Sequence, residues 1–155
     1  MKTRATILTV AALFAAVVVC FAAGDANMGT WKLNEAKSKF AAGATKNSTV
    51  VYSADGDKMK VTVDGTASDG KAIHSEWTGK FDGKDYPVTG DPSNDSRAYK
   101  RVNAHTLSMT LKKDGKVSGT GTIVISADGK SRTVTTSTTN AAGKKSNSTA
   151  VYDKQ

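Results

Sequence analysis

The sequence predicts an all-β protein whose chain forms a single antiparallel, up-and-down β-barrel of about eight to ten strands. Turn residues recur at regular intervals, and the segments between them alternate apolar and polar residues. No biased stretch long enough to act as a linker follows Gly24. Because an open sheet of this size would expose two edges, we expect the sheet to close on itself.

Turn residues recur at a regular spacing along the chain. Five Asp-Gly pairs separate alternating segments, and their glycines lie 13 or 14 residues apart except for one gap of 32 residues after Gly83. Asp-Gly between alternating segments is typical of a two-residue type I′ hairpin, in which both central residues have positive φ. The pairs are Asp55-Gly56, Asp69-Gly70, Asp82-Gly83, Asp114-Gly115 and Asp128-Gly129.

The alternating segments define the strands. In residues 71–81, for example, Ile73, Trp77 and Phe81 share one face, and His74 and Glu76 share the other. Such alternation is typical of a strand with one buried and one solvated face. The predicted strands are residues 28–33, 47–53, 58–66, 71–81, 96–102, 105–112, 116–126, 130–138 and 145–153.

Two segments do not fit the strand pattern. Residues 35–40 are expected to form one or two helical turns. Residues 85–94 hold both prolines, Pro87 and Pro92, and are expected to be irregular. In residues 116–126, Val117, Gly119 and Gly121 share the inward face with Ile123 and Ile125. The two glycines there either allow a sharp bend, which we prefer, or leave room for a ligand.

Residues 1–23 have the character of a secretory signal peptide, so residues 24–155 are expected to form the barrel domain. Lys2 and Arg4 precede an apolar stretch over residues 5–19, and cleavage after Ala22 or after Ala26 fits the small-residue rule. Export to the periplasm or the medium is expected, with an uncleaved anchor as the alternative. The only cysteine, Cys20, leaves with the signal, so no disulfide is expected.

The chain is moderately basic. The formal net charge is +8, and without Lys2 and Arg4 it is 20 − 14 = +6. The lysines are scattered, which favours a solvated surface over binding to an acidic polymer. A clustered basic stripe, as in nucleic-acid-binding proteins, is not seen. The dispersed aromatic residues and the Ser/Thr/Lys-rich outer face also disfavour a membrane barrel, so no membrane span is expected in the mature chain.

The two ends of the mature chain carry a resemblance. The opening Gly29-Thr30-Trp31-Lys32-Leu33 resembles the first strand of calycins, the superfamily of lipocalins and fatty-acid-binding proteins. The ending, from Thr149 to Lys154, is similar to the last strand of fatty-acid-binding proteins. The resemblance implies a lipocalin-like barrel, closed structurally by Gly29 and Trp31. The pattern GTWKLN…YDKQ is more similar still to exported bacterial proteins of unassigned function.

Two departures from fatty-acid-binding proteins affect the implied ligand. Those proteins hold a carboxylate with Arg-x-Tyr on the last strand; here Tyr152 matches the tyrosine, but Ala150 stands in place of the arginine. A carboxylate buried without a cation is costly, so a fatty acid bound in that way is not expected. Residues 34–46 are also too few for the two helices that cover the cavity in that family.

Most of the candidate ligand-binding residues lie in the gap of the turn pattern, and Trp77 and Tyr152 lie outside it. Aromatic side chains there are expected to line a pocket, and two arginines alternate with a tyrosine on one strand face. An inward face would favour an anionic ligand, but an outward face is preferred. The candidates are Trp77, Tyr86, Arg97, Tyr99, Arg101 and Tyr152.

No catalytic or metal-binding set emerges from the sequence. His74 and Glu76 share a strand face but lack a third ligand, and the acidic turns do not match a calcium loop. We therefore expect a protein that is not an enzyme and has no cofactor or metal. The preferred function is binding of a small apolar or amphipathic ligand inside the barrel. The alternative is a structural or interaction module of the cell envelope with a filled core.

Overall fold

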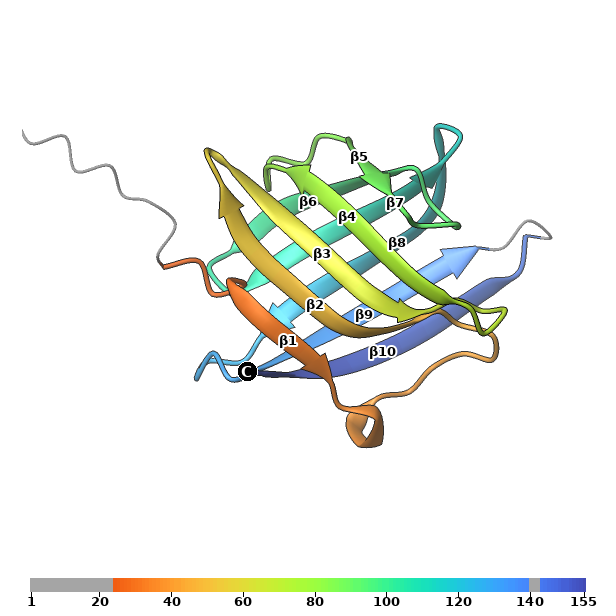
Figure 1. Ribbon diagram of the computed structural model, residues 1–155, viewed down its shortest axis with the longest axis horizontal. Coiled ribbons are helices and arrows are strands. Elements are labelled where there is room, and N and C mark those ends of the chain that lie inside the picture. Colours follow the sequence, from red (N-terminus) through yellow and green to blue (C-terminus); the bar gives the residue numbers. More distant parts are fainter. Residues whose placement is uncertain (1–23, 140–142) are drawn as a thin grey trace, which may run out of the picture.

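The computed structural model describes residues 24–139 and 143–155, and the signal peptide expected over residues 1–23, with Cys20, lies outside them. Ten antiparallel strands form a closed barrel in which each strand pairs with its neighbours in sequence and the first strand pairs with the last (Figure 1). The predicted all-β, up-and-down barrel is confirmed, and this architecture is consistent with a calycin-like fold.

The strands follow the alternating segments closely, and their bounds differ from the expected ones by a few residues. A single 3-10 turn, η1 (Glu35–Lys37), follows the first strand, with Asn34 as its N-cap. The strands are β1 (Gly29–Leu33), β2 (Lys46–Asp55), β3 (Lys58–Thr66), β4 (Ala72–Gly79), β5 (Tyr86–Thr89), β6 (Ser96–Asn103), β7 (Thr106–Lys113), β8 (Lys116–Ile125), β9 (Ser131–Thr139) and β10 (Lys145–Lys154).

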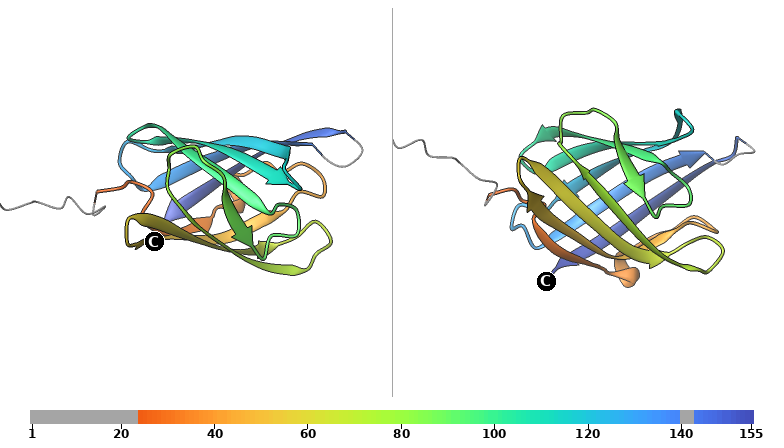
Figure 2. Two further views of the ribbon diagram at one scale, coloured as in Figure 1. Left: turned by 90° about the horizontal axis from the view of Figure 1, so that it is seen from above. Right: turned by 45° about the horizontal axis from the view of Figure 1, so that its top comes forward.

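The barrel is flattened into two layers. In Figure 1, strands β1 to β4 lie in front and run across strands β7 to β10 behind them, and Figure 2 shows the two layers from above. This is the geometry of orthogonally packed sheets whose corners are turned by coiled strands. Within the described part of the chain, no helix is long and apolar enough to cross a membrane.

The Asp-Gly turns differ in type. At Asp114-Gly115 both residues have positive φ, +50° and +72°, as expected for type I′. Between β2 and β3 the loop is Gly56-Asp57, and only the glycine has positive φ, which is the type II′ pattern. Asp128-Gly129 belongs to a longer loop closed by a bond from the Gly129 N–H to the Ser126 carbonyl. The general prediction of type I′ turns was therefore wrong, although the positions of the turns were correct.

The segment expected to be irregular, residues 85–94, contains the short strand β5. It pairs with β4 through Thr89 and Val88, and with β6 through Tyr86 and Pro87. Pro87 lacks an N–H and so weakens the strand signal in the sequence. Only two residue pairs join β5 to each neighbour, so β5 completes the wall of the barrel with the least strand pairing.

The face of β8 also changes along its length. The register of β7 and β8 shifts between Leu111 and Lys112, which pair with Gly119 and Val117 respectively. Ser118 is the extra residue of this bulge, and Val117 is 57% exposed. The prediction that Val117 shares the inward face of Ile123 was therefore wrong, because a bulge reverses the alternation.

One end of the barrel is filled by side chains and is here called the floor. Trp31 is fully buried there, and its indole Nε1 donates to the carbonyl of Asn27 at 2.7 Å. The Asp25 carboxylate accepts hydrogen bonds from the backbone N–H and side-chain amide of Asn27 and pairs with Arg101. Residues 25–28 therefore close the floor from below, beside the Trp31 side chain.

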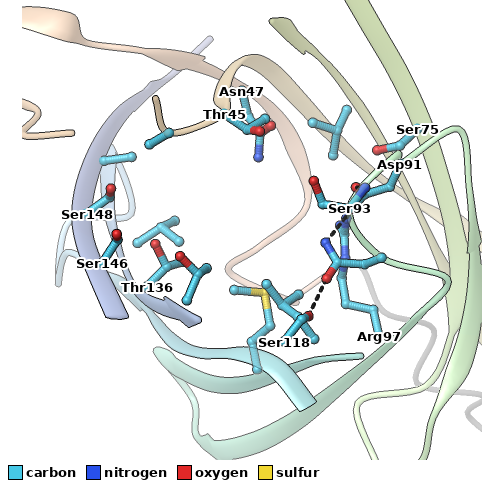
Figure 3. Close-up of a pocket in the computed structure, with 18 of the residues that line it drawn as sticks. Thr45, Asn47, Ser75, Asp91, Ser93, Arg97, Ser118, Thr136, Ser146 and Ser148 are labelled. Carbon is cyan, nitrogen blue, oxygen red and sulfur yellow. Dashed lines mark hydrogen bonds and ion pairs between the residues drawn. The ribbon is translucent and has the colours of Figure 1, made fainter. Parts of the chain in front are cut away.

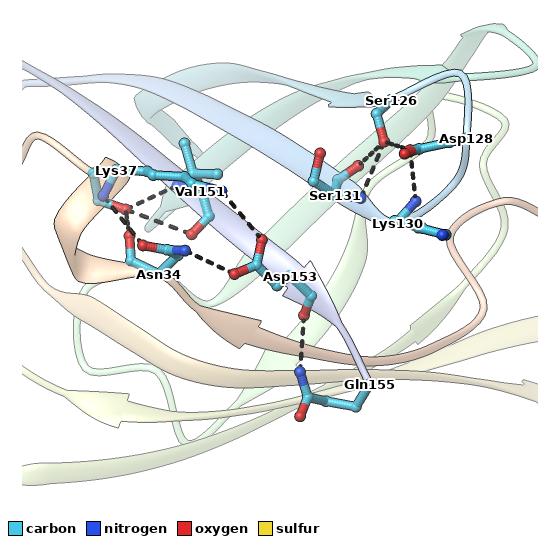
Figure 4. Close-up of polar contacts among 10 residues, drawn as sticks. Asn34, Lys37, Ser126, Asp128, Lys130, Ser131, Val151, Asp153 and Gln155 are labelled. Carbon is cyan, nitrogen blue, oxygen red and sulfur yellow. Dashed lines mark hydrogen bonds and ion pairs between the residues drawn. The ribbon is translucent and has the colours of Figure 1, made fainter.

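Polar contacts fix the seam where β1 meets β10 (Figure 4). The Asn34 amide donates to the Asp153 carboxylate at 2.7 Å, and the Lys37 ammonium lies 4.0 Å from the same group. The Ser38 hydroxyl accepts a hydrogen bond from the N–H of Val151 at 2.9 Å. The 3-10 turn thus ties the first strand to the last and completes the barrel.

Candidate functional site

A cavity of about 820 Å³ occupies the half of the barrel opposite the floor. It opens at the end here called the mouth, which is formed by residues 40–45, 67–71 and 90–95 and the hairpin turn at Asp114-Gly115. Figure 3 shows a ring of side chains that surround the open centre of this cavity. The interior is therefore hollow in its upper half and packed in its lower half.

Arg132, on β9, lies at the bottom of this cavity. Its side chain is 2% exposed, and its guanidinium carbon lies 5.1 Å from the ring centres of Trp31 and Tyr52 and 4.7 Å from that of Tyr152. Such distances are within the range of cation–π attraction. We call these four residues the arginine box.

The charge of Arg132 has no counterion among the described residues. Its Nε and Nη1 atoms are buried without a hydrogen-bond partner, whereas Arg97 and Arg101 each pair with an aspartate. An unpaired buried cation is costly, and cation–π contacts offset only part of that cost. The floor of the cavity therefore offers unused donors and positive charge to whatever enters it.

The two tyrosines of the arginine box are held in the neutral form. Burial raises the pKa of Tyr52 to about 12, against the opposing effect of the nearby Arg132 charge. Burial likewise raises the pKa of Tyr152 to about 12, again opposed by Arg132. At neutral pH neither phenol can act as the anionic partner of the guanidinium, so the box keeps its positive charge.

A second arginine near the mouth has a counterion, although its Nε atom is also buried without a hydrogen-bond partner. The Arg97 guanidinium donates to the Asp91 carboxylate at 2.7 Å, and the two side chains are 10% and 11% exposed. Burial opposes the charged form of Arg97, but Tyr99 and Asp91 outweigh it and raise the Arg97 pKa. The Asn94 amide also donates to Asp91, at 2.9 Å, and the Ser118 hydroxyl donates to Asn94 at 2.6 Å (Figure 3).

The strand face of β6 that carries Arg97 and Tyr99 points inward, contrary to the sequence-based expectation. Arg97 and Tyr99 point inward and line the cavity, so the outward interpretation was wrong for both. Arg97 tolerates burial because residues 90–95 bring Asp91 to it. Arg101 is on the same face but lies at the floor end, where it pairs with Asp25 and covers the ring of Phe81. It does not line the cavity.

The other aromatic candidates belong to a packed cluster. Trp77 is stacked on Phe81 at 6.2 Å and meets Tyr86 and Tyr99 edge-to-face at 5.7 and 4.8 Å. The Trp77 indole donates to the carbonyl of Arg97, and the Tyr86 hydroxyl donates to the Asp82 carboxylate. Trp77 and Tyr86 therefore stabilise the wall, whereas the sequence analysis expected them to line the pocket. Tyr99 is the member of the cluster that reaches the cavity.

Tyr152 lines the cavity, and the cation expected to be missing beside it is present. Arg132 is the direct cross-strand partner of Tyr152 in the pairing of β9 with β10. A carboxylate bound beside Tyr152 would therefore have a cation nearby, contrary to what Ala150 led us to expect. Sequence reasoning missed Arg132, although its inward position follows from alternation with Val134, which lies two residues along the same strand.

The mid-strand glycines of β8 serve the backbone. A Cβ atom on Gly121 would lie 2.6 Å from the Thr135 carbonyl oxygen, and one on Gly119 would lie 3.0 Å from the Ser137 oxygen. Neither glycine lines the cavity. The close approach of β9, and not space for a ligand, therefore accounts for both glycines, and the bend stays a prediction.

His74 and Glu76 lie on the outside of the barrel. The His74 Nδ1 atom is 2.6 Å from Asp64, which raises the His74 pKa, and Nε2 is 3.8 Å from Glu76. Lys60 pairs with Glu76 at 3.0 Å and lowers the pKa of that carboxyl. Among the described residues, no three His, Cys, Asp or Glu side chains are grouped so as to hold a metal ion.

Comparison with known proteins adds a likeness of fold. No family model matches the chain, and no curated protein matches it. A redesigned β-barrel, mFAP1, solved bound to DFHBI, is 17% identical with a TM-score of 0.44, over 85% of this chain and 98% of that one. The structure of EF1p2_mFAP2b bound to DFHBI gives 15% and 0.47, over 84% and 94%. These scores carry no argument about the ligand of the present chain.

Proposed function

We propose that this barrel binds a small amphipathic organic anion without transforming it, with the anionic group on Arg132 and the apolar part in the cavity above. The observation that carries the proposal is a cation buried at the bottom of an open cavity with two donors unused. A carboxylate or similar group would accept hydrogen bonds from those donors and neutralise the charge.

The wall above the arginine box suits an apolar chain. Aliphatic side chains from several strands line the middle of the cavity, and removing the matching surface of a ligand from water supplies the affinity. They are Val50, Val61, Val63, Ile73, Met109, Leu111, Ile123 and Val134. A charged end and an apolar body therefore describe one molecule, an amphiphile. The hollow interior disfavours the alternative of a structural module with a filled core.

Titration calorimetry with dodecanoate and dodecylammonium tests this function. We expect wild-type protein to bind dodecanoate, and to bind the cation of equal chain length far more weakly. Arg132→Met should weaken dodecanoate binding about 10- to 100-fold, because a hydrogen-bonded charge contributes about 1.5–3 kcal/mol. Arg101→Met is the matched control, since Arg101 lies outside the cavity, and it should bind as wild type does.

Two results would refute the proposed function. One is that wild-type protein binds no dodecanoate. The other is that Arg132→Met, shown by circular dichroism to be folded, binds dodecanoate as tightly as wild type. Methionine fills a volume similar to that of the arginine stem, and replacing an unpaired buried charge by an apolar group is generally tolerated.

We also propose that the protein is exported and that cleavage occurs after Ala22 and not after Ala26. The support is that Asp25 pairs with Arg101, and that Asn27 is buried beneath Trp31. Cleavage after Ala26 would remove Asp25 and place a new ammonium group on the buried Asn27. The intact mass of the secreted protein tests this, and a mass beginning at Asn27 would refute it.

A further inference from the structure

The cavity wall changes character in steps from the floor to the mouth. Along β9 and β10 every second residue faces inward, and the inward residues of the two strands pair directly. From the floor upward these pairs are a cation with a phenol, then two apolar side chains, then two successive pairs of hydroxyls. They are Arg132 with Tyr152, Val134 with Ala150, Thr136 with Ser148, and Thr138 with Ser146.

We call the four hydroxyl residues Thr136, Thr138, Ser146 and Ser148 the hydroxyl collar. Figure 3 shows Thr136, Ser146 and Ser148 on one side of the open centre. The Ser148 oxygen accepts a hydrogen bond from the N–H of Ala41 at 3.0 Å, which leaves its proton to donate. Every hydroxyl of the collar can both donate and accept, so the collar can pair with a polar group of either kind.

The distance between the collar and the arginine box sets the length of a ligand that reaches both. Thr136 is four residues from Arg132 on the same strand, which corresponds to about 13 Å of strand. An extended dodecanoate chain covers a comparable length. A ligand of this size with its anionic end on Arg132 therefore places its other end among the collar hydroxyls.

We propose that the cavity selects anionic amphiphiles that carry a hydrogen-bonding group at the end remote from the anion, such as ω-hydroxy acids. This inference rests on the proposed function, because the unpartnered, buried Arg132 is what orients the ligand. A methyl end at the collar would cover hydroxyls and leave them without partners, which is unfavourable. A terminal hydroxyl would replace the water that those groups lose.

The test compares 12-hydroxydodecanoate with dodecanoate by titration calorimetry. We expect wild type to prefer the hydroxy acid about three- to tenfold, the effect of one net hydrogen bond. The double variant Thr136→Val/Thr138→Val should lose that preference. Its matched control is Thr133→Val/Thr135→Val, which makes the same changes on the outward face of β9 and should keep it.

The outcomes separate this inference from the proposed function. If dodecanoate binds but wild type shows no preference for the hydroxy acid, the inference is overturned and the proposed function stands. A preference that persists in Thr136→Val/Thr138→Val also overturns the inference. If neither acid binds, both fail. The comparison on wild-type protein needs no variant, so an absent preference overturns the inference even if a variant does not fold.

Discussion

The buried ion pair between Asp91 and Arg97 makes a sharp prediction about stability. Both side chains are about nine-tenths buried and lie 2.7 Å apart, so Asp91→Asn leaves the Arg97 charge without a counterion. Breaking such a pair from one side costs about 3–5 kcal/mol. Because the one carbonyl oxygen of asparagine can take the place of Oδ2 and still accept from Arg97 and Asn94, at the loss of the Ser93 N–H bond, we expect the lower value, about 3 kcal/mol.

Urea denaturation followed by circular dichroism measures this loss. With a slope near 2 kcal/mol per molar urea, the midpoint should fall by roughly 1.5 M. Asp57→Asn is the control, since Asp57 pairs with Lys80 but is 74% exposed, and its midpoint should not move measurably. The double variant Asp91→Asn/Arg97→Met should recover much of the loss, because the stranded charge is gone.

A midpoint shift in Asp91→Asn no larger than that in Asp57→Asn would contradict this prediction. A double variant as unstable as the sum of its two single changes would contradict it as well. Either result would show that Arg97 is solvated in the absence of Asp91, and that residues 90–95 are held to the barrel by other contacts.

Two further predictions concern the backbone and the arginine box. Gly90→Ala should destabilise the fold in thermal denaturation far more than Gly143→Ala. Both glycines have positive φ, so both substitutions cost backbone strain. Only at Gly90 would the added Cβ also meet a backbone atom, the His74 oxygen at 2.0 Å. Equal losses would contradict this. In an alkaline absorbance titration, Tyr52 and Tyr152 should ionise only near pH 12. Because the folded state raises both pKa values, their contribution to stability is complete below pH 10 and lost as the pH approaches 12. Ionisation of Tyr52 or Tyr152 near pH 10 in the folded protein would refute it.

Much of the fold was predictable because its signals are local. Alternation locates most strands, and glycine marks the turns because positive φ is costly for other residues. The errors arose where a single residue alters a local rule. Pro87 concealed β5, and the extra residue Ser118 reversed the face of Val117. Neither effect follows from strand periodicity, since both depend on how a neighbouring strand pairs.

The candidate site was less predictable because its components meet across strands. Arg132 and Tyr152 are 20 residues apart in sequence but directly paired in the sheet. A family pattern that requires both on one strand misses this arrangement. The orientation of Arg97 likewise depends on a carboxylate that a separate segment provides. Tyr152 lines the cavity, as expected of a candidate ligand-binding residue, whereas the preferred outward orientation of Tyr99 was wrong.

The most direct test of the account is the orientation of a bound ligand. In crystals grown with 12-bromododecanoate, the anomalous signal of bromine marks the end of the chain remote from the carboxylate. We predict that this signal lies at the mouth, beside Thr136 and Ser148, with the carboxylate on Arg132. A bromine beside Trp31 and Tyr152 would place the anion at the mouth and contradict the role of the arginine box.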